Sequence, residues 1–120
     1  LGLYGGEERD LSFRILEAGY QILYASDIMI YHKVSPDGRM SKEKENFFRY
    51  RTQLIVLNRY MPRIYRYSAN LIWSIFYLIK KSGTLKEVIE VFHDLSLLSK
   101  CTISRRTLLY IKSVNGRLFY

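Results

Sequence analysis

Three carboxylates lie within four consecutive positions near the start of the chain, at Glu7, Glu8 and Asp10. Carboxylates this close repel one another, so such density indicates charges that lie in solvent, meet cations or take part in chemistry. The residues from Glu8 to Ala18 have the pattern of an amphipathic helix. The acids then lie at a helix N-terminus, where unpaired N–H groups and the helix dipole favour negative charge. The motif is therefore either a stabilising first turn or a reactive site.

The elements that follow this helix are predicted to be short strands. Gly19 is placed to end the helix, and alternating apolar residues predict a strand from Tyr20 to Ala25. A turn at Ser26-Asp27 separates it from a second strand, Ile28 to His32. Apolar residues on both faces favour a covered sheet. Ser35 to Gly38 has the residues of a type I turn.

The rest of the chain is predicted to be helical. A helix is expected from Ser41 to Tyr60, ended by Pro62, and another from Thr84 to Leu98, where Thr84 and Glu87 form a capping box. Residues 104–114 fit a helix stopped by Asn115-Gly116, which we favour because the preceding segments look helical. The same dipeptide also fits a hairpin turn between two short strands.

The segment from Arg63 to Lys81 is predicted to be a helix with one narrow polar stripe and a broad apolar face. Its apolar stretch is shorter than the roughly 20 residues that span a bilayer. Basic and aromatic residues at the ends of a broad apolar face suit a helix lying in a membrane surface. They equally suit a helix buried against the rest of a larger protein.

Charge is divided unevenly along the chain, whose net charge is +8. Residues 1–58 hold eight basic and eight acidic side chains, whereas residues 59–120 hold eleven basic and three acidic ones. A basic half indicates an anionic partner or, equally on charge alone, a basic face that lies in solvent. The absence of a recognisable reader motif disfavours nucleic acid. The single cysteine, Cys101, can form no internal disulfide, which favours a cytoplasmic protein. The basic helical tail favours a place at the inner face of the cell membrane.

Three stretches together resemble a known family: Tyr4 to Arg14, Glu17 to Tyr24 and Asp27 to His32. They are similar to the C-terminal part of the catalytic domain of family 2 glycosyltransferases, in the rhamnosyltransferase-like branch that builds cell-wall or O-antigen polysaccharides. The likeness is close over residues 3–39 and loose as far as the helix that holds Arg51. It implies an α/β fold, in which residues 1–40 are the C-terminal piece of a GT-A (Rossmann-like) domain and residues 41–120 a helical, basic extension.

The resemblance also implies residue roles. Glu8 would be the general base of an inverting transferase and would take a proton from the acceptor hydroxyl as that oxygen attacks the anomeric carbon. Glu7 and Asp10 would orient the catalytic loop. Arg14, the counter-charge of Asp10, and Arg51 would bind substrate or diphosphate.

The same resemblance implies a divalent metal, Mg²⁺ or Mn²⁺, with His32 as a ligand. The donor would be a nucleotide sugar and the acceptor a polysaccharide or a lipid-linked glycan. The chain begins without Met and carries no Asp-x-Asp motif and no first βαβ unit, so we expect a fragment of a longer enzyme that is inactive alone. The alternative function is a non-enzymatic, basic helical module that binds an anionic membrane surface through residues 63–81.

Overall fold

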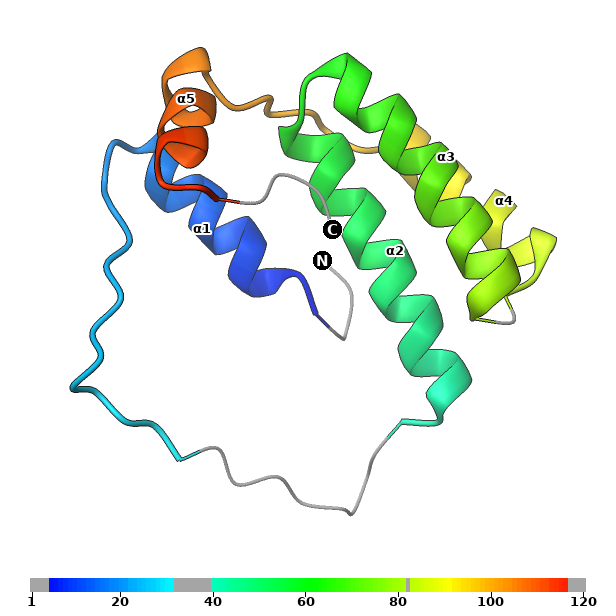
Figure 1. Ribbon diagram of the computed structural model, residues 1–120. Helices are drawn as coiled ribbons and strands as arrows, with labels where there is room; N and C mark the ends of the chain where they lie inside the picture. Colours follow the sequence, from blue (N-terminus) through cyan, green and yellow to red (C-terminus); the bar gives the residue numbers. More distant parts are fainter. Residues whose placement is uncertain (1–4, 32–39, 82, 117–120) are drawn as a thin grey trace.

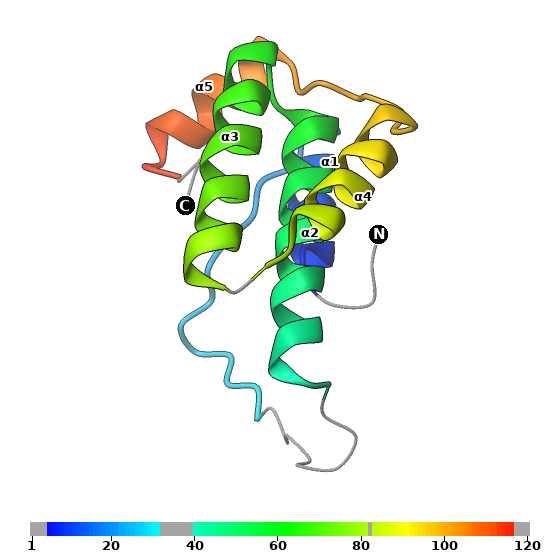
Figure 2. The ribbon, with the colours of Figure 1, turned by 90° about the vertical axis from the view of Figure 1, so that its right-hand side faces the viewer.

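A computed structural model describes residues 5–31, 40–81 and 83–116. Over these residues the fold consists of five helices (Figure 1). They are α1 (Glu7–Glu17), α2 (Lys42–Tyr60), α3 (Arg63–Lys80), α4 (Leu85–Ser96) and α5 (Arg105–Ser113). α2 lies in the middle, with α1 on one side of it and α3 and α4 on the other (Figure 1). Seen from that other side, α3 and α4 lie to either side of α2, and α1 lies behind it (Figure 2).

The helix ends follow local sequence signals. Gly19 has φ 91°, and the N–H groups of Gly19 and Tyr20 donate to the carbonyls of Leu16 and Ile15, which ends α1 in a Schellman motif. The predicted capping box at the start of α4 is confirmed: Thr84 accepts from the Glu87 N–H, and Glu87 accepts from the Thr84 N–H.

The predicted tail helix is also confirmed, as α5. It ends with Asn115 at φ 54°, and the Gly116 N–H donates to the Ile111 carbonyl at 2.7 Å. This is a second Schellman arrangement, so Asn115-Gly116 closes a helix instead of turning a hairpin.

Two hydrophobic clusters hold the helices together, and α2 contributes to both. The first cluster joins α1, α2 and α5 through Phe13, Leu57 and Ile111. The second joins α2, α3 and α4 through Leu54, Tyr77 and Val91. Leu54, Val56 and Leu57 are fully enclosed because α2 is covered on several sides. A helix in this position holds its neighbours, and any site between them, in fixed relation.

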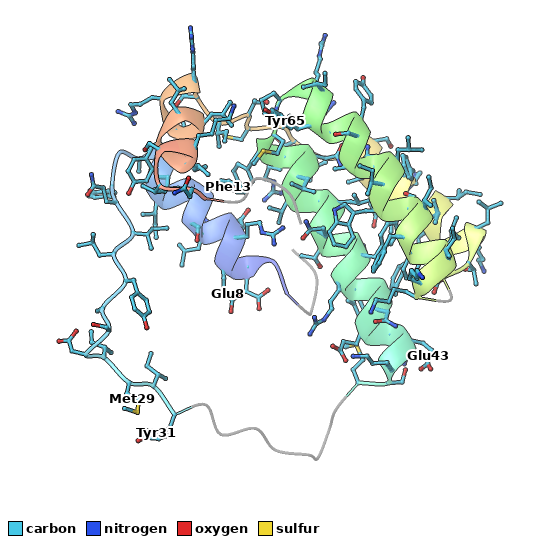
Figure 3. All side chains as sticks on the ribbon, viewed as in Figure 1. Glu8, Phe13, Met29, Tyr31, Glu43 and Tyr65 are labelled. Carbon is cyan, nitrogen blue, oxygen red and sulfur yellow. The ribbon has the colours of Figure 1, made fainter. Side chains whose placement is uncertain are left out.

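The predicted α/β fold is wrong, because the described residues contain no strand. The N–H of Ile28 donates to the carbonyl of Ala25, so the turn at Ser26-Asp27 is present. The flanking residues, predicted as strands, form an irregular segment that extends away from the helices, with Met29 and Tyr31 far from the core (Figure 3).

The segment from Tyr20 to Tyr31 fails to form strands for a physical reason. A strand is stable only when a neighbouring strand pairs with its backbone and another layer covers its apolar face. Among the described residues neither is provided, and Tyr24 is 93% exposed. The alternating apolar residues are compatible with strands, but strands form only where a neighbouring strand is present to pair with them. The predicted type I turn at residues 35–38 lies outside the described residues.

Candidate functional site

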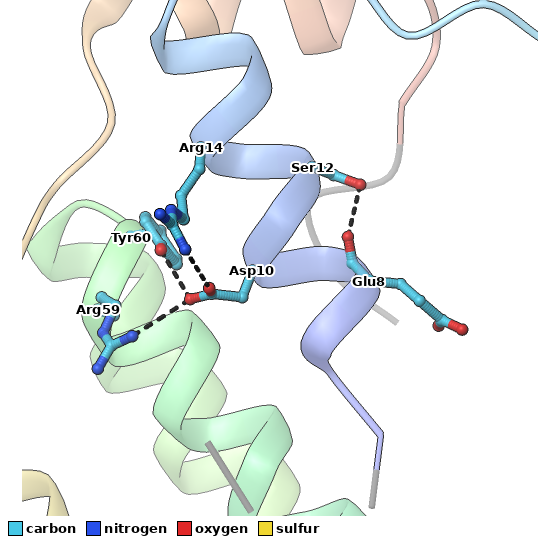
Figure 4. A network of polar contacts seen from close by, with 6 residues as sticks. All are labelled: Glu8, Asp10, Ser12, Arg14, Arg59 and Tyr60. Atoms are coloured by element: carbon cyan, nitrogen blue, oxygen red, sulfur yellow. Dashed lines mark hydrogen bonds and ion pairs between the residues drawn. The ribbon is translucent and has the colours of Figure 1, made fainter.

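The three acids of the N-terminal motif of α1 differ in their surroundings. Glu7 and Glu8 are exposed, whereas Asp10 is buried against α2. Figure 4 shows Glu8 pointing away from the Asp10 network, toward the opposite side of the helix. The motif therefore does not gather three carboxylates at one point, because positions 8 and 10 are turned by about 200° from one another on the helix.

Asp10 anchors α1 to α2. Its Oδ1 accepts a hydrogen bond from the Tyr60 hydroxyl at 2.7 Å and pairs with Nη1 of Arg59 at 3.2 Å. Its Oδ2 lies 3.9 Å from Nη1 of Arg14, the predicted counter-charge (Figure 4). Burial, together with the hydrogen bond to Asp10, raises the pKa of Tyr60 above its ordinary value. The four groups form one network at the helix interface.

Glu8 lines an open cleft of about 490 Å³ between the start of α1, the first half of α2 and the second half of α3. Three basic side chains line the same cleft, namely Arg9, Arg49 and Lys81. This volume lies within the range of small-molecule sites in proteins. The cleft therefore has room for a ligand, and its lining carries more positive than negative charge.

Polar and aromatic groups of α2 and α3 complete the cleft. The Gln53 Oε1 accepts a hydrogen bond from Nη1 of Arg9, and the Gln53 Nε2 is buried with no hydrogen-bond partner among the described residues. Trp73 and Phe76 meet edge to face, with ring centroids 5.7 Å apart. The Nζ of Lys81 lies 5.9 Å from the Phe76 centroid. Both rings line the cleft, so one wall is apolar and the other is polar.

The remaining predicted site residues lie elsewhere. Nε of Arg51 contacts Oδ2 of Asp94 at 2.7 Å, which links α2 to α4 away from Glu8. His32, the predicted metal ligand, lies outside the described residues, and the described part of the chain holds no group of three metal-ligating side chains. The metal and the roles of Glu7, Glu8, Asp10, Arg14 and Arg51 in sugar transfer stay predictions.

A second notable feature is the outer surface of α3, which we call the α3 apolar face. Its members share large apolar side chains, high exposure and spacings of three or four residues: Ile64, Tyr67, Leu71, Ile72, Ile75, Phe76 and Ile79. Ile64 is 75% exposed and Ile79 is 70% exposed, although both are among the most apolar residue types. Ala69 and Tyr77, on the side toward α2, are buried.

Charged groups of one sign flank the α3 apolar face. Arg63 begins the helix, and Lys80 and Lys81 end it, and all three are exposed. The helix contains no acidic residue. Among the described residues no helix is both long and apolar enough to cross a membrane. The surface of α3 therefore combines exposed apolar side chains with cations at both ends.

Sequence reasoning missed the cleft and the partners of Asp10. Tyr60 is 50 residues from Asp10 along the chain, and no local pattern joins them. The residues of the cleft likewise come from three helices. One local signal was present: Phe76 and Lys81 lie close together near the end of the predicted helix 63–81. An ammonium group near an aromatic ring is attracted by the negative face of the ring, so the two side chains are expected to lie together.

Comparison with known proteins finds a relative that matches part of this chain. No family model matches the chain, and no solved structure matches it. The described residues form five helices joined by irregular segments. An uncharacterized protein of Haemophilus influenzae is 94% identical over 33 residues, which are 28% of this chain and 97% of the relative. The chain belongs to the same family as that protein, whose name states no function.

The predicted membership of the family 2 glycosyltransferases is therefore wrong. The described residues form five helices and lack the strands of a GT-A domain. No family model matches, and the name of the relative is not that of a glycosyltransferase. In this chain the acidic motif and the Gly-Tyr pair have local structural roles at the two ends of α1. Glu7, Glu8 and Asp10 occupy the first turn of α1, and Gly19 ends the helix.

Proposed function

We propose that this protein binds an anionic membrane surface through the α3 apolar face, at the inner face of the cell membrane. The observation that carries the proposal is the exposure of seven large apolar side chains on one helix flanked by Arg63, Lys80 and Lys81. Contiguous exposed apolar patches of this kind mark interaction surfaces in soluble domains. The occupant we assign is a bilayer surface that carries negatively charged headgroups.

Charge complementarity supports a lipid partner. Basic side chains near an anionic leaflet contribute about 1 kcal/mol each, and the contribution falls off within a Debye length. Arg63 lies at one end of α3, and Lys80 and Lys81 lie at the other. A helix lying flat in the interface would bring both ends to the headgroups and its apolar side chains to the acyl boundary.

The fold supports a peripheral mode of binding. α3 is 18 residues long and packs one side on α2 through Ala69 and Tyr77, so that side stays attached to the protein. Only the outer side remains for the bilayer. Because the helix carries polar residues on its inner side, partial immersion leaves those groups in their protein contacts, where Asn70 exchanges hydrogen bonds with Asn58.

The experiment is co-sedimentation of the chain with vesicles of phosphatidylcholine alone and with vesicles that also contain phosphatidylglycerol. The proposal predicts binding that increases with the fraction of phosphatidylglycerol and weakens as salt is added. Equal sedimentation with both vesicle types, or none with either, would contradict it. The second outcome would favour the other reading of this helix, a face that packs against another protein.

A further inference from the structure

We propose that the cleft beside α3 binds the phosphate of an anionic phospholipid headgroup while the α3 apolar face lies against the acyl chains. This inference rests on the proposed membrane function and assigns the lipid group that the protein recognises. The cleft holds about 490 Å³ and is lined by α1, α2 and α3. A headgroup with its glycerol fits a space of this size.

The charges of the cleft favour a phosphate. Arg9, Arg49 and Lys81 line it together with one carboxylate, Glu8. Arg9 is held by Gln53, and Arg49 is paired with Oε1 of Glu45 at 2.9 Å. Guanidinium groups bind phosphate oxygens with directed N–H bonds, and an ammonium group binds them as a point charge. Cations that are already oriented lose less conformational entropy when a ligand arrives.

Gln53 is an independent observation that points to a ligand. Its Nε2 is buried, and no described residue accepts its N–H groups. A buried donor without an acceptor destabilises the protein. Arg9 donates to the oxygen of the same amide, which identifies that oxygen as the acceptor and the nitrogen as the donor. A phosphate oxygen in the cleft would satisfy this donor.

The position of the cleft connects it to the membrane. Phe76 is 40% exposed and belongs to the α3 apolar face, and it also lines the cleft. Lys81 lines the cleft as well and is exposed at the end of α3. The two surfaces therefore share a rim. A lipid whose phosphate lies in the cleft can extend its glycerol past Trp73 and Phe76 toward the bilayer.

The chain supplies its own probe, because Trp73 is the single tryptophan and lines the cleft. The experiment measures Trp73 fluorescence as soluble glycerol phosphate is added, and in parallel measures binding to phosphatidylglycerol vesicles. The test variant is Arg49→Gln with Lys81→Gln. The matched control is Arg105→Gln with Lys112→Gln, which removes the same charge from exposed positions on α5. Helical circular dichroism checks that both variants fold.

We expect glycerol phosphate to change the fluorescence of the wild type and of the control. For the cleft variant, binding of glycerol phosphate should weaken by about a hundredfold or more, because two charge-assisted contacts are lost. Vesicle binding should likewise weaken more in the cleft variant than in the control. These results together would support a phospholipid headgroup in the cleft.

Two other results overturn the inference in different ways. If vesicles bind, both double variants weaken equally and glycerol phosphate leaves Trp73 unchanged, the membrane surface stands and the headgroup cleft is wrong. If glycerol phosphate binds through Arg49 and Lys81 but vesicles do not bind, the cleft takes a free phosphate ester. In that case the lipid assignment and the proposed membrane function are both wrong.

Discussion

At the scale of single residues, Asp10 shows how a reactive-looking motif becomes structural. Its carboxylate accepts from Tyr60 and pairs with Arg59, and both partners belong to α2. A buried carboxylate is stabilised when hydrogen bonds and cations replace the water that it loses. The neighbouring Glu8 meets none of these partners and lines the cleft instead. Burial thus divides the acidic motif into an anchor and an exposed pair.

The anchor makes a direct prediction. Asp10→Ala should lower the free energy of unfolding by about 2 kcal/mol, because the Tyr60 hydroxyl and the Arg59 guanidinium lose their shared acceptor. The measurement is equilibrium unfolding in urea. Glu7→Ala is the control and should change stability by less than about 0.5 kcal/mol, since Glu7 is exposed. Equal effects of the two variants would show that the network contributes nothing.

At the scale of the helices, α5 is attached to α1 through Glu17. The Oε2 of Glu17 accepts from the Ser104 N–H at 3.0 Å and from the Ser104 hydroxyl at 3.3 Å. Nη2 of Arg106 also donates to the Glu17 carbonyl at 3.4 Å. Burial alone would raise the pKa of Glu17, but the hydrogen bonds from Ser104 and Thr107 and the charge of Arg106 lower it below the usual 4.5.

This lowered pKa predicts a dependence of stability on pH. The unfolded chain binds a proton at Glu17 more readily than the folded chain does, so the contribution is complete above about pH 4.5 and is lost as pH falls through the folded value. Glu17→Gln should therefore reduce stability by roughly 1 kcal/mol at neutral pH, and the difference should shrink near pH 3. Urea unfolding at both pH values measures it.

The control for this comparison is Glu90→Gln, a change of the same kind at an exposed position on α4. It should alter stability little at either pH. A difference between wild type and Glu17→Gln that stays constant across the acidic range would contradict the assigned role of the carboxylate.

The helices were predictable from the sequence because their signals are local. The capping box at Thr84, the stop at Gly19 and the spacing of apolar residues each act within a few positions. The segment 20–31 was not predictable in this way, since a strand depends on a partner that its own residues do not supply. The resemblance to family 2 glycosyltransferases favoured the same wrong prediction, because a GT-A domain would supply neighbouring strands for this segment.

The candidate site was only partly predictable for the same reason. The broad apolar face of residues 63–81 followed from periodicity, and the structure shows it exposed. The cleft and the Asp10 anchor depend on residues that are far apart in the chain, such as Arg9 with Gln53 and Asp10 with Tyr60. Only packing around α2 brings these residues together.

At the scale of the whole molecule, the buried helix α2 holds the other helices, and α3 carries the exposed apolar surface. α2 is covered by its neighbours and contributes to both hydrophobic clusters. α3 packs one side on this support and leaves the other side exposed, with the cleft along one rim. Four of the eleven basic residues of the second half of the chain, Arg63, Arg66, Lys80 and Lys81, lie on α3 or at its end. A supported, basic and apolar helix is well suited to a membrane interface.

The most direct test of this account compares two identical substitutions at similarly exposed positions. Leu71 is 63% exposed on the α3 apolar face, and Leu109 is 54% exposed on α5. Leu71→Gln should weaken binding to phosphatidylglycerol vesicles about tenfold, because an immersed leucine contributes on the order of 1.5 kcal/mol. Leu109→Gln should leave that binding near the wild-type value. Equal affinities for the two variants would contradict the claim that the α3 apolar face binds the membrane.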